Sequence, residues 1–125
     1  MKKILIEAGG VKLEAELNES KTAQAIYEAL PLEARGSRWG DEIYFSTPVK
    51  LGPEEGARAE VEVGALAYWP PGNAFCIFFG PTPASTGSQP QAASPVNVFG
   101  RVLGDATLLK DTPHGVKVKV SKLEE

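Results

Sequence analysis

The chain has 125 residues, 42% of them hydrophobic, and its charges of both signs leave a net charge of −3. This length suits one domain with a buried core, and the apolar content is too high for a disordered chain. The absence of a basic stripe argues against a nucleic-acid partner, and the absence of an apolar run of about 18 residues argues against a membrane-spanning helix.

The N-terminal segment predicts a β-hairpin. Two strand-like runs, Ile4–Ala8 and Val11–Leu17, are separated by Gly9-Gly10. Two glycines suit the tight turns of hairpins because these turns need positive φ. In the second run apolar and charged residues alternate, which is typical of a strand with one buried face.

One helix is expected after the hairpin. Apolar side chains recur from Ala23 to Leu30 at the spacing of a single helical stripe, and Pro31 ends the pattern. Either Asn18 or Ser20 can cap the N-terminus of this helix, because both side chains carry an oxygen that accepts a hydrogen bond from the first turn.

The middle and end of the chain alternate loops with short strands. Residues 32–41 contain glycine and serine and are expected to form a loop. Residues 80–95 hold four prolines, no charge and no large apolar side chain, which predicts a long loop of the kind that is often functional. A helical turn is expected at Asp105–Lys110. The strand-like runs are Glu42–Ser46, Ala59–Val63, Leu66–Trp69, Phe75–Phe79, Val96–Val102 and Val116–Val120.

About eight short strands with one or two helices predict a mainly β domain that spans residues 1–125, either a sandwich or a barrel. A family resemblance favours the barrel. The run Gly64–Pro83 and the later run Val96–Val102, which contains Phe-Gly-Arg-Val, resemble the second half of a cyclophilin. Residues Trp39–Phe45 and Phe78–Ser85 are more similar to small prokaryotic cyclophilin-like proteins of unassigned function.

This resemblance covers residues 1–122 and implies a closed eight-stranded, mostly antiparallel barrel with a helix at each end. Barrels of this size fill their interior with side chains, so a ligand is expected in a groove on the outer face. Cyclophilins isomerise the peptide bond before proline with an arginine near the prolyl nitrogen. The matching region here holds Asp41 or Glu42, although Arg35 or Arg38 could supply an arginine from the loop. We therefore expect weak or absent isomerase activity, with Arg38 as the catalytic candidate.

The resemblance also suggests a ligand pocket. Phe79 matches the phenylalanine that lines the proline pocket of cyclophilins, while a register slip of one residue would put Phe78 there instead, and both could also be core residues. Trp69 either edges the groove or packs against it. Trp39 is expected to cover a ligand, and Tyr44 either presents its hydroxyl to a bound backbone or is buried.

Other chemistries have little support in the sequence. His114 is the only histidine and is expected to be exposed in a turn, whereas Cys76, the only cysteine, lies in an apolar run and is expected to be inert. One histidine and one cysteine cannot make a typical zinc site, and no phosphate-binding loop is present, so no metal and no cofactor are expected. The single cysteine also fits a reducing compartment.

Three functions remain open. The first is a groove that binds an extended, proline-containing peptide or protein segment without fast turnover, the second a weak isomerase with a relocated arginine, and the third a protein-interaction subunit. The short apolar stretch after Met1-Lys2-Lys3 is too small for a signal-peptide core, so a cytoplasmic location is expected. Sparse Asn, Gln, Cys and Met with abundant Pro and Gly point to a thermophilic source.

Overall fold

The predicted hairpin is present in the computed structural model, which describes residues 2–123. Strands β1 (Lys3–Ala8) and β2 (Val11–Leu17) pair in antiparallel register, with Ala8 opposite Val11. The turn between them places Gly9 at a φ of 60°, a conformation that glycine adopts without strain. The hairpin prediction is therefore confirmed.

The predicted helix is α1 (Lys21–Ala29), and its cap is Ser20 rather than Asn18. The Ser20 hydroxyl accepts a hydrogen bond from the main-chain N–H of Ala23 at 3.1 Å. Ala23 and Ile26 are buried against the barrel, as the apolar stripe predicts. Within residues 2–123 no helix is long and apolar enough to cross a membrane.

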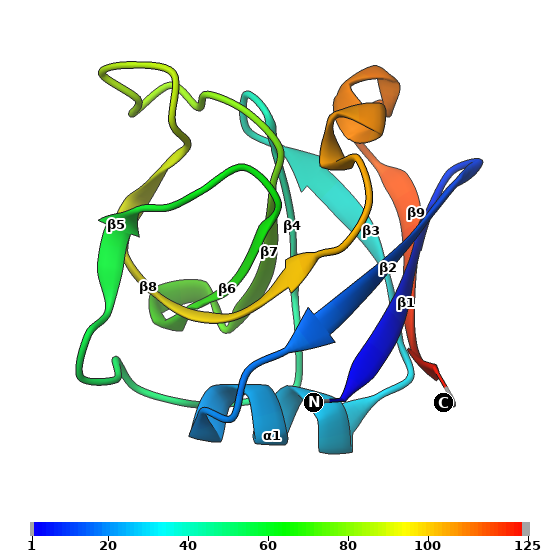
Figure 1. Ribbon diagram of the computed structural model, residues 1–125, viewed down its shortest axis with the longest axis vertical. Coiled ribbons are helices and arrows are strands. Elements are labelled where there is room, and N and C mark those ends of the chain that lie inside the picture. The colour runs from blue at the N-terminus through cyan, green and yellow to red at the C-terminus, as the bar shows by residue number, and fades with distance from the viewer. Residues whose placement is uncertain (1, 124–125) are drawn as a thin grey trace.

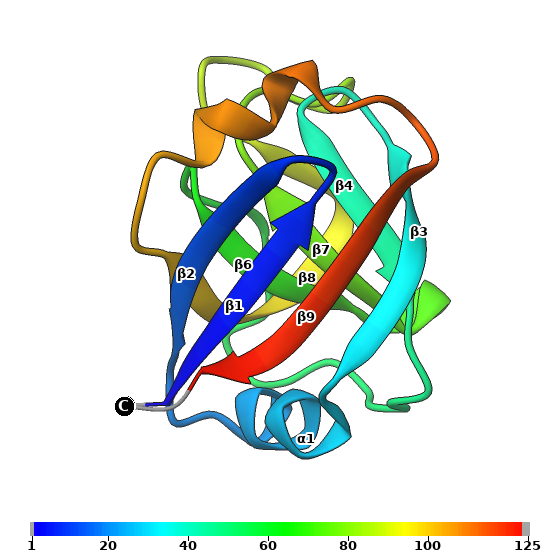
Figure 2. The same ribbon diagram turned by 90° about the vertical axis from the view of Figure 1, so that its right-hand side faces the viewer.

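The remaining strands are β3 (Leu32–Arg38), β4 (Glu42–Ser46), β5 (Arg58–Glu60), β6 (Ala65–Trp69), β7 (Ala74–Phe78), β8 (Gln91–Val102) and β9 (Val116–Leu123). Among the described residues the strands follow the order β2-β1-β9-β3-β4-β7-β6-β8, and β2 also pairs with β8. These eight strands therefore close into a ring (Figures 1 and 2), and every pairing is antiparallel. The closed eight-stranded barrel is confirmed, with β5 added outside the ring beside β8.

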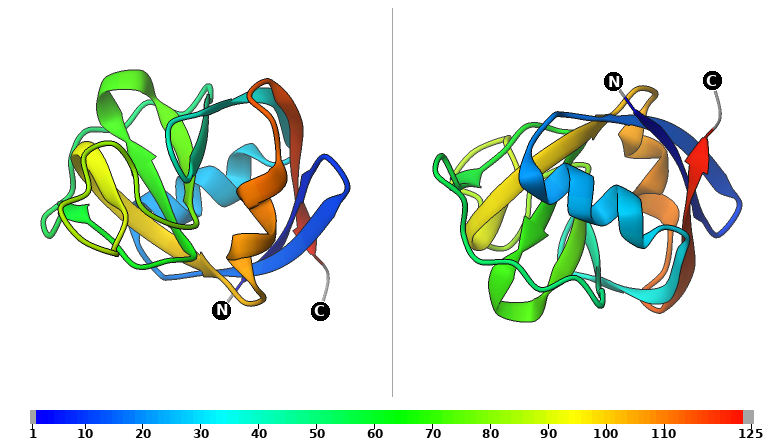
Figure 3. Two further views of the ribbon diagram at one scale, coloured as in Figure 1. Left: turned by 90° about the horizontal axis from the view of Figure 1, so that it is seen from above. Right: turned by 90° about the horizontal axis from the view of Figure 1, so that it is seen from below.

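The two ends of the barrel are covered by helices. Helix α1 lies across one open end, and a 3₁₀ helix at Ala106–Asp111 lies at the other (Figures 2 and 3). Side chains fill the interior, including three phenylalanines: Phe75 stacks on Phe45 with ring centroids 5.0 Å apart and meets Phe99 edge-on at 5.1 Å. Buried apolar side chains occupy the space between the two covered ends, which agrees with the packing expected of such barrels.

Two loop predictions were wrong. Residues 32–38 form strand β3, which pairs with β9 from Leu32 opposite Val120 to Gly36 opposite Val116. Gly36 is needed for close packing rather than for a turn, because a Cβ there would lie 2.6 Å from Cγ2 of Ile43. The 80–95 loop ends early, since β8 begins at Gln91 and pairs with β5.

The strand predicted at residues 59–63 is also longer than the strand in the structure. Strand β5 ends at Glu60, where it pairs with Gln91. Val61 is still buried as the pattern predicts, but Val63 lies in the following turn and is 47% exposed. The predicted helical turn near residue 105 is confirmed, with Asp105 as the cap of the 3₁₀ helix.

Residues 47–57 have no helix or strand and are held by buried side chains from the barrel. The Asn97 amide oxygen accepts a hydrogen bond from the main-chain N–H of Glu54 at 2.8 Å, and its nitrogen donates to the Gly52 carbonyl at 3.0 Å. The Tyr68 hydroxyl donates to the Val49 carbonyl at 2.6 Å. These bonds replace the ladder that a strand would supply.

Candidate functional site

A second buried cluster lies outside the barrel, on the outer face of β4, β7 and β6. Tyr44 of β4 and Ala67 of β6 both stand opposite Cys76 of β7, so the three side chains share one face of the sheet. Ala92 and Val96 of β8 cover this face and are themselves buried. The sheet and the first half of β8 thus form two walls with an apolar layer between them.

Between these walls lies a cavity of about 230 Å³, here called the aromatic cavity. Its lining residues are Trp39, Glu42, Tyr44, Trp69, Cys76, Ala92, Ala93 and Val96. The three aromatic side chains are half-buried, so each one both contacts the protein and borders the open space. Both tryptophans of the chain belong to this lining.

The tryptophans are fixed by local contacts. Trp39 follows β3 in a tight turn, and its main-chain N–H donates to the Glu42 carbonyl at 3.0 Å. The indole N–H of Trp69 donates to the Ser94 hydroxyl at 2.7 Å, which ties its ring to β8. Gly72 leaves room for that ring, since a Cβ there would lie 2.9 Å from it. The aromatic walls are therefore preformed.

Glu42 is the polar group of the aromatic cavity. Only 5% of this residue is exposed, and burial raises the pKa of its carboxyl from 4.5 to about 7, although a hydrogen bond from the Cys76 thiol lowers it in part. Burial and the nearby Glu42 carboxyl raise the pKa of the Cys76 thiol well above 9.0. Near neutral pH the thiol is therefore protonated and a poor nucleophile, whereas the carboxyl is present in both its neutral and its charged form.

The structure brings three of the predicted ligand-binding residues together, namely Trp39, Tyr44 and Trp69. Phe78 is buried in the same outer cluster but does not line the cavity. Phe79 lies in the barrel interior with no exposed surface, and the Arg38 guanidinium stands 5.0 Å from its ring centroid. The two phenylalanines therefore pack on opposite sides of the sheet.

Arg38, the catalytic candidate, is engaged at the end of the barrel. Its guanidinium donates to the carbonyls of Thr112, Lys110 and Gly40 at 2.5, 3.2 and 3.0 Å, and to the Asp41 carboxylate at 3.3 Å. It does not line the aromatic cavity. The exposed His114 accepts a hydrogen bond from the main-chain N–H of Arg38 at 3.0 Å, which is a structural contact.

Some lining residues were missed although a local pattern indicated them. Glu42 sits two residues before Tyr44 in a strand that otherwise places Ile43 and Phe45 in the core, so the alternation puts both on the other face. Ala92 and Ala93 gave no signal, because they were assigned to the 80–95 loop. Among the described residues no group of three or more metal-ligating side chains is placed to hold a metal ion.

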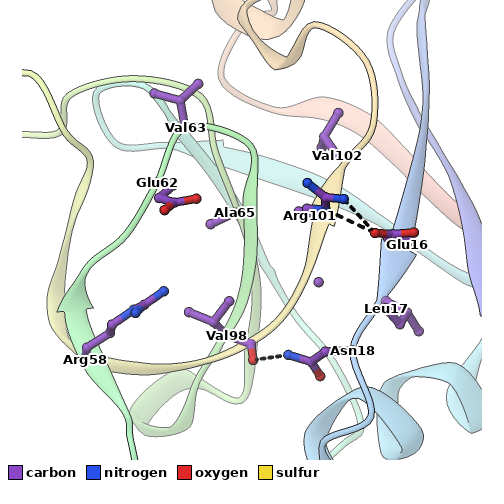
Figure 4. Close-up of a pocket in the computed structure, with 11 residues that line it drawn as sticks. Glu16, Leu17, Asn18, Arg58, Glu62, Val63, Ala65, Val98, Arg101 and Val102 are labelled. Carbon is purple, nitrogen blue, oxygen red and sulfur yellow. Dashed lines mark hydrogen bonds and ion pairs between the residues drawn. The ribbon is translucent and has the colours of Figure 1, made fainter. Parts of the chain in front are cut away.

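A second hollow, of about 340 Å³, lies between β5, β6, β8 and the end of β2 (Figure 4). Its charged groups carry both signs. Arg101 donates to the Glu16 carboxylate through two N–H groups at 3.1 and 2.9 Å, while Arg58 and Glu62 extend from the opposite wall (Figure 4). Because this hollow has balanced exposed charges, it offers less chemical selectivity than the aromatic cavity.

Comparisons with known proteins agree with this architecture. A family model described as Cyclophilin-like matches residues 2–121. The solution structure of the hypothetical protein AF2241 from Archaeoglobus fulgidus is 40% identical in sequence and superposes with a TM-score of 0.81. That match covers 98% of this chain and 95% of the other. Among curated proteins, none matches this chain.

Proposed function

Because this chain belongs to the cyclophilin-like family, we propose that its aromatic cavity binds one compact apolar group of an extended peptide, a proline ring, without fast isomerisation. The observation that carries this proposal is the convergence of Trp39, Tyr44 and Trp69 on one preformed space. Aromatic side chains with fixed rotamers lose little entropy on binding, so they are effective anchors for a small ring.

Proline suits these walls for two physical reasons. Its ring is apolar and compact, and the closed ring has few rotamers to lose on binding. Burial against the aromatic walls would contribute roughly 25 cal/mol for each Å² removed from water. The first half of β8 extends past its pairing with β6, which begins at Asn97, and gives the bound peptide a neighbouring backbone along the cavity.

The charges around the cavity favour binding over catalysis. Rotation about the prolyl bond has a barrier of about 18–20 kcal/mol, which a positive group near the nitrogen lowers. No arginine among the described residues lines the aromatic cavity, and Glu42 supplies a carboxyl instead. The guanidinium of Arg38 already donates hydrogen bonds to three carbonyls outside the cavity. This arrangement argues against Arg38 as a relocated catalytic arginine.

The test uses the intrinsic fluorescence of the protein. Since both tryptophans line the cavity, a bound ring should change their emission directly. We expect saturable changes on titration with members of a proline-containing peptide library, and a loss of affinity in Tyr44→Ala. Tyr27→Ala serves as the matched control, because Tyr27 belongs to α1, lies beside Lys2 and Lys122, and does not line the aromatic cavity. If Tyr44→Ala binds every selected peptide as tightly as the unaltered protein, the cavity is not the binding site.

A further inference from the structure

The aromatic cavity combines two features that a purely apolar pocket lacks. Two tryptophans and one tyrosine line its walls, and Glu42, a residue that is only 5% exposed, borders the same space. The neighbour of this carboxyl is the Cys76 thiol, which is a weak donor. Among residues 2–123 no lysine, arginine or histidine forms an ion pair with it.

A buried carboxylate without a cation is costly, and an occupant that carries a positive charge removes this cost. Aromatic rings attract cations through their quadrupole, most strongly when the site is shielded from water. The walls and the carboxyl therefore select for the same property, positive charge on a compact apolar group. A neutral occupant would satisfy the walls alone.

We propose that the occupant of the aromatic cavity is a chain-initial proline, whose ring nitrogen is a charged secondary ammonium that donates to Glu42 while the ring packs against the aromatic walls. This inference rests on the proposed function and specifies it. A proline inside a peptide has an uncharged nitrogen with no proton to donate, so it cannot pair with the carboxyl. The ring at the start of a chain meets both requirements with one residue.

The proposal predicts how affinity depends on pH. The titratable groups that line the cavity with Glu42 are Tyr44 of β4 and Cys76 of β7, while β6 and β8 contribute none to the lining. Burial raises the pKa of the Cys76 thiol and so keeps this thiol neutral. Affinity should therefore rise as Glu42 ionises near pH 7 and fall once the chain-initial amine, with an ordinary pKa of about 8, loses its proton.

The experiment compares three peptides that differ only at the first residue: free proline, N-acetylproline and a cyclopentanecarbonyl group, which is the neutral carbon isostere of the ring. Binding is followed by tryptophan fluorescence and calorimetry. The free-amine peptide should bind at least about tenfold more tightly than the isostere, and Glu42→Gln should abolish this preference. Near-ultraviolet circular dichroism of Glu42→Gln checks that the variant is folded.

Each other outcome is informative. Equal or tighter binding of the isostere to the unaltered protein overturns the inference, whatever Glu42→Gln does, and leaves the proposed apolar anchor intact. Binding of the N-acetylated peptide without binding of the free amine does the same. If no proline peptide of either kind binds while the protein is folded, the proposed function fails together with the inference.

Discussion

Replacing Glu42 by glutamine should change the pH dependence of stability. In the folded protein the carboxyl has a pKa of about 7, compared with 4.5 when it is not buried. Because a tenfold change in an ionisation constant corresponds to about 1.4 kcal/mol, ionising Glu42 in the folded state costs about 3 kcal/mol. Glutamine has nearly the same shape and carries no charge at any pH, so it removes this cost.

The sign follows from proton binding. Between pH 4.5 and about 7 the folded protein keeps a proton on Glu42 that the unfolded chain has lost. The free energy of unfolding therefore falls as the pH rises through this window, and the loss is complete above about pH 7. Relative to Glu42→Gln, the unaltered protein should lose about 3 kcal/mol of stability across the window.

The assay is urea unfolding followed by tryptophan fluorescence, at about pH 5 and about pH 8, for the unaltered protein and Glu42→Gln. Comparing the difference between the two proteins cancels the titration of all other groups. Glu60→Gln is the control, because this strand carboxylate is exposed and does not line the aromatic cavity. If the stabilities of Glu42→Gln and the unaltered protein stay parallel from pH 5 to pH 8, Glu42 does not titrate in a buried site and the reasoning is wrong.

Three further substitutions test the packing and hydrogen bonding of the barrel and of residues 47–57. Gly100→Ala should lower the free energy of unfolding by about 1–3 kcal/mol in urea melts, because its Cβ would lie 2.6 Å from the Glu16 carbonyl oxygen where β8 pairs with β2. An unchanged midpoint would mean that the two strands move apart at little cost. Asn97→Ala leaves the Glu54 N–H and the Gly52 carbonyl without partners and should cost about 1–3 kcal/mol, with proteolysis expected first within residues 47–57; cleavage elsewhere would contradict this. Phe79→Ala should cost about 3–5 kcal/mol in thermal and urea melts, and a variant as stable as the parent would place Phe79 outside the core.

Local sequence patterns predicted the elements that depend on local signals. The Gly9-Gly10 turn and the helical stripe ended by Pro31 are visible within a few residues, and both elements are present. Strand β3 was missed because its residues are weakly apolar and its stability comes from pairing with β9, far away in the chain. Gly36 was interpreted as a loop residue although it is needed where Ile43 and Val118 approach.

The candidate site was predictable only in part, for a related reason. The aromatic residues Trp39, Tyr44 and Trp69 could be named as separate candidates, and the barrel resemblance placed a groove on the outer face. Their convergence depends on the register between β4, β7 and β6, which no local pattern specifies. One wall of the aromatic cavity depends on the first half of β8, most of which was predicted to belong to the 80–95 loop.

Strand β8 belongs to the closed ring in its second half and pairs with β5 in its first half, so the two halves should differ in how easily they open. The second half, from Asn97 to Val102, lies in the closed ring between β6 and β2, so its amide protons exchange with solvent only when the barrel itself opens. The first half pairs with the short β5 and can detach while the ring stays intact. Since Ala92 and Val96 form one wall of the aromatic cavity, a ligand bound in that cavity should suppress this local opening and leave the global unfolding of the barrel unaltered.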